Sequence, residues 1–200
     1  MIIIGVTGPT GAGKSLASKT AEALGFKVVN CDLVAREAVV KGSQGLKALA
    51  QVFGADILLE SGELDRKKLA QKAFATKENT ELLNKTIFPY IKKIVLAEAD
   101  SDLVLLDAPT LFESGLNSEC YKTVAVLADT NIRLSRILER DNISNEDALL
   151  RINAGKDDKY YKERADYILF NNGDEAEYIY EFINVINDIK NIFSKEKNDE

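Results

Sequence analysis

A glycine-rich segment near the N-terminus holds the residues best suited to chemistry. Residues 8–15 read Gly-Pro-Thr-Gly-Ala-Gly-Lys-Ser and follow the apolar run of residues 2–6. Glycines at this spacing let backbone N–H groups turn towards a polyphosphate, and a helix that begins near Lys14 adds the positive end of its dipole. The pattern predicts a phosphate-binding loop for ATP, with Lys14 on the phosphates and Ser15 on Mg²⁺. The residues predicted to contact ATP in this segment are Gly8, Thr10, Gly11, Ala12, Gly13, Lys14, Ser15 and Leu16.

Acidic residues follow two further apolar runs. Asp32 comes soon after residues 27–29, where a carboxylate can accept the proton of a hydroxyl that attacks the γ-phosphate. The structural alternative for Asp32 is an N-cap for a helix that starts near Leu33. Asp107 ends a third apolar run and is predicted to hold Mg²⁺. Glu113 is predicted to bind Mg²⁺, its waters or the acceptor, and the alternative is a surface carboxylate.

Three arginines recur at helical spacing further along the chain. Arg133, Arg136 and Arg140 lie at i, i+3 and i+7, so they should share one helix face. After a phosphate loop, this stripe favours a helical lid over residues 131–164 that closes on phosphates. The alternative is a solvated charged face with Leu134 and Leu138 in the core. Ser144 with Asp147 predicts a capping box for a second helix of this lid.

Composition narrows the classes of function. The chain has 200 residues, 32 acidic and 26 basic, so its net charge of −6 disfavours nucleic-acid or anionic-membrane partners. The absence of histidine excludes Ser-His-Asp and Cys-His hydrolases, so a general base must be a carboxylate, a lysine or a tyrosine. Two scattered cysteines, no long apolar run and no leader pattern favour the cytoplasm. We expect a monomer or a weak homo-oligomer.

The spacing of apolar runs predicts an α/β fold. Runs separated by helical patterns indicate a five-stranded parallel sheet covered on both faces, whose ligands bind beyond the carboxyl ends of the strands. About seventy residues separate the second and third runs, so we expect 33–100 to be a helical insert that binds the acceptor, with one helix opened by Pro89. Residues 175–193 predict a last helix, and the charged end 195–200 is expected to be disordered. The five runs are Ile2–Val6, Lys27–Val29, Leu103–Leu106, Thr123–Leu127 and Tyr167–Phe170.

Taken together, these segments resemble the dephospho-coenzyme A kinase family, whose fold is the three-layer P-loop kinase fold. The resemblance implies transfer of the ATP γ-phosphate to the ribose 3′-hydroxyl of dephospho-coenzyme A, with Asp32 as the base. It also implies that Arg36, Pro109 and Glu113 contact the acceptor, and that Arg136 and Arg140 bind ATP from the lid, Arg140 with a catalytic role beside Lys14. The matching segments are GVTGPTGAGKS (5–15), CDLVAR (31–36), LDRKKL (64–69), FPYI (88–91), LDAPTLFE (106–113), RLSRILERD (133–141) and ADYILFNNG (165–173).

The match to this family has departures, and it has rivals. The family often has Asp-Ala-Asp where this chain has Asn30-Cys31-Asp32, and Ala-Gln where it has Ala154-Gly155. A nucleoside monophosphate kinase or another small-molecule kinase would share the loop and the fold. A GTPase switch should carry Asn-Lys-x-Asp, and the nearest segment, residues 84–87, lacks the aspartate. A nucleotide-binding protein without turnover also stays open at this point. The turn 171–174 after the last run is predicted to line the adenine pocket through its backbone.

Overall fold

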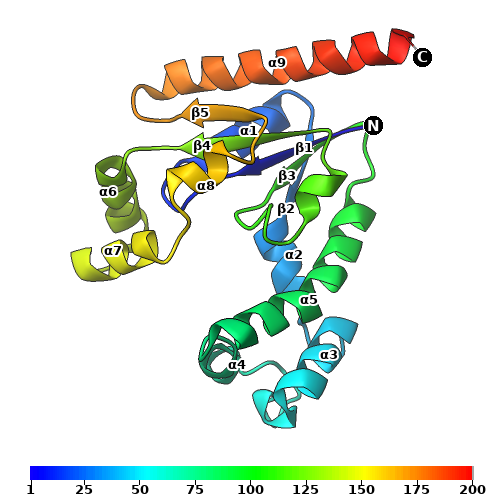
Figure 1. The fold of residues 1–200 in the computed structure, drawn as a ribbon, viewed down its shortest axis with the longest axis vertical. Coiled ribbons are helices and arrows are strands. Elements are labelled where there is room, and N and C mark those ends of the chain that lie inside the picture. Colours follow the sequence, from blue (N-terminus) through cyan, green and yellow to red (C-terminus); the bar gives the residue numbers. More distant parts are fainter. Residues whose placement is uncertain (200) are drawn as a thin grey trace. The chain divides into compact units, whose positions relative to one another are not determined.

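The computed structural model describes residues 1–199, and within them five strands form one sheet in the order β2-β3-β1-β4-β5 (Figure 1). Strand β1 is parallel to both β3 and β4, and β4 is parallel to β5. The predicted parallel sheet is confirmed, and each predicted run is extended by at most one residue. The strands are β1 (Ile2–Thr7), β2 (Lys27–Asn30), β3 (Leu103–Asp107), β4 (Lys122–Leu127) and β5 (Tyr167–Phe170).

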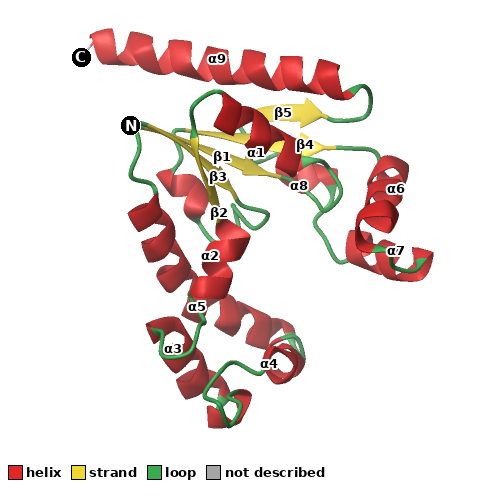
Figure 2. Cartoon of the chain, turned by 180° about the vertical axis from the view of Figure 1, so that it is seen from behind, coloured by secondary structure: helices red, strands yellow, loops and turns green. Residues whose placement is uncertain are grey.

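Helices cover the two faces of this sheet (Figure 2). Successive side chains of a strand point to opposite faces, so Val124 and Val126 of β4 face one way and Ala125 and Leu127 the other. The two valines belong to the main core with residues of α1 (Lys14–Ala23) and α9 (Glu175–Asp199). The other two pack with Tyr161 of α8 (Asp158–Lys162). Because both faces are buried, the strands are almost continuously apolar, as expected for a parallel sheet.

A helical hairpin follows β4. It consists of α6 (Thr130–Asp141) and α7 (Asn145–Asn153), which pack through buried Ile137, Ala148 and Ile152. Helix α6 ends at Asp141, and the left-handed φ of 49° at the following residue, Asn142, turns the chain. The Ser144 hydroxyl accepts from the Asp147 backbone N–H at 3.0 Å, which confirms Ser144 as the N-cap of α7. The Asp147 carboxylate accepts from the Ser144 hydroxyl at 2.8 Å, whereas in a full capping box it would accept from the Ser144 backbone N–H.

The chain divides into two compact units, Met1–Val29 with Ser101–Glu200 and Asn30–Asp100. The second unit is helical. Each of its four α-helices is preceded by an N-cap residue whose side chain accepts a backbone N–H: Asn30, Ser43, Asp65 and Thr76. That residues 33–100 bind the acceptor stays a prediction. The elements of this unit are α2 (Cys31–Glu37), α3 (Gln44–Phe53), η1 (Ala55–Ile57), α4 (Arg66–Ala73) and α5 (Lys77–Glu98).

The prediction that Pro89 opens a helix is wrong. Pro89 lies inside α5, a single helix of 22 residues. An interior proline has no N–H to donate and costs a helix about 3 kcal/mol. Ile87, Ile91 and Val95 lie at a spacing of four on both sides of the proline and are buried in this unit. Burial of each such side chain contributes roughly 1.5–3 kcal/mol, which is enough to carry the helix through the proline.

The expected disorder of the C-terminal end is also wrong for most of its length. Helix α9 continues through Asp199, while Glu200 lies outside the described residues. Among residues 1–199, no helix combines the length and the apolar character that crossing a membrane requires.

Candidate active site

The glycine-rich segment forms a tight turn between β1 and α1. Gly8, Gly11 and Gly13 have φ values of 141°, 79° and 100°, which residues with a side chain rarely adopt. Space is short as well, because a Cβ on Gly8 would overlap the carbonyl of Val126, and one on Gly13 would overlap the amide of Asn171. The backbone itself therefore requires glycine at these positions.

Lys14 begins α1 and reaches back over the loop. Its ammonium donates to the Gly8 carbonyl at 2.8 Å and to the Pro9 carbonyl at 3.3 Å. Ser15 follows in the first turn of α1, where its side chain is exposed. The loop thus carries a cation, an exposed hydroxyl and a helix N-terminus together, which is a suitable environment for phosphate.

Side chains brace the loop from outside through its carbonyl groups. The Arg133 Nε donates to the Thr10 carbonyl at 2.9 Å, and the buried Asn171 amide donates to the Ala12 carbonyl at 3.0 Å. Arg136 donates to the same Ala12 carbonyl at 3.3 Å and to the Asn171 side-chain oxygen at 3.0 Å. The structure therefore joins β1, α6 and the end of β5 around the loop. Sequence reasoning missed the Asn171 side chain, whose only signal was a polar residue directly after an apolar strand.

The three lid arginines do not form one exposed stripe. Arg133 is only 5% exposed, and burial lowers the pKa of its guanidinium. Arg140 is exposed and bonds to Asp141 at 2.7 and 2.9 Å, which raises the pKa of Arg140, and Arg151 bonds to the same carboxylate. The binding of ATP by Arg136 and Arg140 stays a prediction, and Arg136 already lies at the loop.

The carboxylate predicted to hold Mg²⁺ ends β3. Its Oδ2 accepts from the Ser18 hydroxyl at 2.9 Å, and Ser18 lies one helical turn after Lys14 on α1. Ser18 is 8% exposed, on the side of α1 that buries Ala17 and Ala21. A small polar residue on this apolar face was the signal that sequence reasoning passed over. The contact connects the β3 carboxylate of Asp107 with the helix that carries Lys14 and Ser15.

Glu113 lies in the segment that follows β3, among tyrosines. Its Oε2 is buried and has no hydrogen-bond partner among the described residues. Burial first, and then the negative charge of Glu113, raise the pKa of Tyr161 to about 12. A buried carboxylate oxygen without a donor is costly, so this side chain is well suited to a ligand that supplies one. Pro109 lies earlier in the segment, and its carbonyl accepts from the Thr7 hydroxyl at 3.2 Å.

Asp32 and Arg36 belong to the helical unit, on α2. The alternative in which Asp32 caps this helix is wrong, because the Asn30 side chain accepts from the Leu33 backbone N–H at 3.0 Å. Position 30, where the chain departs from the family pattern, therefore has a structural role as the cap. Asp32 and Arg36 are both exposed, and their spacing of four places them on one face of α2.

No cluster of three or more residues able to hold a metal is found among residues 1–199. The absence of such a cluster among these residues is compatible with Mg²⁺, which is usually held by one or two protein oxygens together with waters and substrate phosphates. A hydroxyl on Ser15 and a carboxylate on Asp107 are oxygen ligands of that kind.

The turn after β5 supports its neighbours through side chains. Asn172 accepts from the Asp129 backbone N–H at 2.7 Å, and Asp174 accepts from the Ala176 N–H at 2.6 Å at the start of α9. A cavity of about 380 Å³ opens beside this turn and is lined in part by Phe170, Asn172 and Asp174. That the turn lines an adenine pocket stays a prediction.

The family model and the similar known proteins point to the same family. The family model described as dephospho-CoA kinase matches residues 2–177. A dephospho-CoA kinase of Pseudoalteromonas translucida is 40% identical over 172 residues, which cover 84% of this chain and 82% of that relative. Among solved structures, the Thermus thermophilus protein TT1252 has a TM-score of 0.77 and 29% identity, covering 92% of this chain and 95% of its own.

A dephospho-CoA kinase from Campylobacter jejuni has a TM-score of 0.65 and 26% identity, over 94% of this chain and 96% of its own. The agreement therefore extends over the loop, the sheet, the helical unit and the lid segment. This chain belongs to the dephospho-CoA kinase family.

Proposed function

We propose that this protein transfers the γ-phosphate of ATP to the ribose 3′-hydroxyl of dephospho-coenzyme A and so makes coenzyme A and ADP. The observation that carries the proposal is the family match over residues 2–177, which includes the phosphate loop and both predicted substrate regions. The reaction is the last step of coenzyme A synthesis.

The loop is proposed to bind the ATP phosphates. Lys14 now bonds to two loop carbonyls, and a bound polyphosphate would take their place as the partner of its ammonium. Positive charge at this position stabilises negative charge as it develops on the transferred group. Arg136 supplies a second cation beside the loop. Arg140 is proposed to join them when it exchanges Asp141 for phosphate.

Mg²⁺, when bound, neutralises charge on the phosphates. Ser15 and Asp107 are the residues that we propose to hold it. The bond from Ser18 fixes one oxygen of Asp107 and so orients its carboxylate.

Asp32 is proposed to accept the proton of the acceptor hydroxyl as the new phosphate ester forms. An aspartate is ionised at neutral pH and is a weak base, but a loose phosphoryl-transfer transition state needs little proton transfer at an early stage. Arg36, on the same exposed face of α2, suits an anionic acceptor. Glu113 and Pro109 are proposed to contact the acceptor from the segment after β3, where the buried Glu113 oxygen lacks a donor.

We further propose that the protein acts in the cytoplasm as a monomer or a weak homo-oligomer, without nucleic-acid or membrane partners. The net charge of −6 and the two cysteines, one in each compact unit, support this setting.

A panel of acceptors tests the function. The protein is incubated with γ-labelled ATP, Mg²⁺ and equal concentrations of dephospho-coenzyme A, AMP, CMP or adenosine. We expect labelled product from dephospho-coenzyme A at a rate at least about a hundredfold above the others, because enzyme sites that bind polar groups discriminate by such factors. Faster labelling of AMP or CMP would assign the protein to the nucleoside monophosphate kinases instead.

A further inference from the structure

Arg133 is a buried cation whose hydrogen bond goes to a peptide carbonyl. The residue is 5% exposed, its Nε donates to the Thr10 carbonyl at 2.9 Å, and its Nη2 is buried with no hydrogen-bond partner among the described residues. Burial of a guanidinium in this way costs free energy, which an apolar side chain of the same length would avoid. Two features offset this cost: the hydrogen bond to the loop and the negative charge of Asp158, which favours the charged guanidinium.

The peptide that Arg133 holds is part of the phosphate loop. In a trans peptide, the carbonyl of one residue and the N–H of the next point in opposite directions, and the described chain has no cis peptide. A bond that draws the Thr10 carbonyl to α6 therefore turns the Gly11 N–H to the other side. The bond from Asn171 to the Ala12 carbonyl acts in the same way on the Gly13 N–H.

Helix α6 is packed directly against this peptide. A Cβ on Gly11 would lie only 2.8 Å from the Arg133 carbonyl oxygen, and Arg136 donates to the Gly11 carbonyl at 3.4 Å. Helix α6 and the phosphate loop are thus in close contact where the side chain of Arg133 bonds to the loop. Ile137, one turn later on the same helix, is fully buried in the hairpin.

We infer that Arg133 is a positioning residue of the phosphate loop: its Nε fixes the Thr10 peptide so that the Gly11 N–H is directed at bound phosphate. This role rests on the proposed function of the loop, but it differs from the lid role predicted for Arg136 and Arg140. In this role, Arg133 acts through its bond to the Thr10 carbonyl and not through a contact of its own with the nucleotide.

Side-chain length gives a matched pair of variants. The amide nitrogen of glutamine is attached to Cδ, as the Arg133 Nε is, so Arg133→Gln keeps a donor at the same number of bonds from the backbone. Arg133→Met has a similar length and no donor. Both variants remove the same positive charge. A third variant, Arg133→Lys, keeps the charge but places its donor one bond farther out.

The test measures the KM for ATP, the KM for dephospho-coenzyme A, kcat and the melting temperature of each variant. We expect Arg133→Met to raise the KM for ATP about tenfold, the factor that one hydrogen bond is typically worth. Arg133→Gln should stay within about threefold of the wild type, and Arg133→Lys should lie between the two. The KM for dephospho-coenzyme A should not change.

A merely structural role would give another result. Partial unfolding lowers the active fraction, and hence kcat, equally in the Gln and Met variants and leaves both KM values alone. That outcome, or an Arg133→Met variant with a wild-type KM for ATP, would overturn the inference. If Arg133→Met does not fold, the comparison of Gln with Lys decides, because an equal KM for ATP in these two variants contradicts a role for donor placement. An inactive wild type would refute the proposed function instead.

Discussion

Asn30 and Asp32 lie two residues apart and are expected to do different work. The Asn30 side chain caps α2 by accepting from the Leu33 N–H, and this leaves the exposed Asp32 carboxylate outside the cap. Capping of the helix, which was the alternative role for Asp32, is thus performed by Asn30. Substitution of Asn30 should therefore affect stability, and substitution of Asp32 should affect catalysis.

Asp32→Asn should lower kcat by about a hundredfold or more, since general-base catalysis is typically worth that factor. The KM for ATP and the melting temperature should stay close to those of the wild type. Asn30→Ala should instead lower the free energy of unfolding by about 1 kcal/mol, the typical loss on removing a cap, and keep kcat. Steady-state kinetics and urea unfolding of both variants check the pair. An Asp32→Asn variant that only melts earlier would make Asp32 a structural residue.

At the residue scale, sequence reasoning succeeded where the backbone restricts the residue type. Gly8, Gly11 and Gly13 were predicted from spacing, and all three adopt a positive φ. Side chains that act on the loop from elsewhere in the chain were harder to predict. Asn171 is 159 residues from the Ala12 carbonyl that it binds, and no local pattern encodes such a contact. Arg133 was identified as part of a stripe, but its burial depends on the packing of α6 against the loop.

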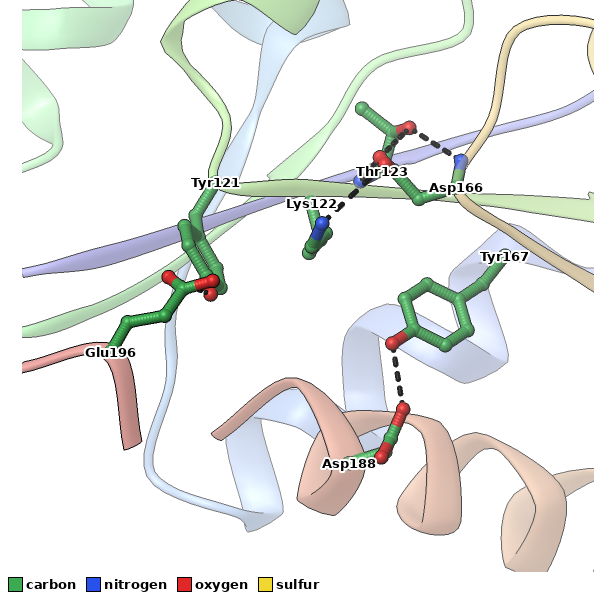
Figure 3. A network of polar contacts seen from close by, with 7 residues as sticks. All are labelled: Tyr121, Lys122, Thr123, Asp166, Tyr167, Asp188 and Glu196. Carbon is green, nitrogen blue, oxygen red and sulfur yellow. Dashed lines mark hydrogen bonds and ion pairs between the residues drawn. The ribbon is translucent and has the colours of Figure 1, made fainter. Parts of the chain in front are cut away.

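The C-terminal helix shows how an element is held in place. Figure 3 shows two tyrosines that point to acidic residues of α9. Tyr121, directly before β4, points to Glu196, and Tyr167 of β5 points to Asp188. The hydrogen bond with Asp188, at 2.7 Å, is the main reason why the pKa of Tyr167 rises to about 12. In the same network, Asp166 accepts from the N–H and the hydroxyl of Thr123, which joins the starts of β5 and β4.

This contact predicts a loss of stability at high pH. Because the folded pKa of Tyr167, about 12, lies above its ordinary value of 10, the protonated phenol stabilises the fold. Its contribution should be complete below about pH 10 and should disappear as the pH rises towards 12. Tyr167→Phe should therefore lower the free energy of unfolding by about 1 kcal/mol or less at pH 8, and by less at pH 11.

Urea unfolding at pH 8 to 11 measures this difference. Tyr180→Phe is the matched control, since Tyr180 lies on α9 with 67% of its surface exposed, and it should leave stability unchanged at every pH. A difference between wild type and Tyr167→Phe that stays constant from pH 8 to 11 would contradict the role of the phenol proton.

Among the elements, strands and caps were easier to predict than helix boundaries. Buried parallel strands are short apolar runs, and their residues pack on both faces, so their pattern is unambiguous here. Ser144 with Asp147 likewise encodes its cap within four residues. The α5 boundary was missed because a proline is a strong local signal for a helix start, whereas burial of Ile87, Ile91 and Val95 is a tertiary effect that overrides it.

At the scale of the whole molecule, the sheet unit and the helical unit carry different groups of the proposed site. The sheet unit carries the phosphate loop, the candidate metal residues and the braces Arg133, Arg136 and Asn171. The helical unit, Asn30–Asp100, carries the proposed base Asp32 and Arg36. Sequence alone indicated this division through a connection too long for a simple crossover. The roles of the units towards ATP and the acceptor are proposals that a single reaction brings together.

The most direct test of that reaction is identification of its products. The protein is incubated with ATP, Mg²⁺ and dephospho-coenzyme A, and the products are followed by ³¹P NMR, with Lys14→Ala as the matched inactive enzyme. We expect a new phosphate monoester on the 3′-oxygen of the acceptor ribose, formed in equal amount to ADP, and at least about a hundredfold less of it from Lys14→Ala. Release of inorganic phosphate alone, phosphate on another position, or wild-type turnover by Lys14→Ala would contradict it.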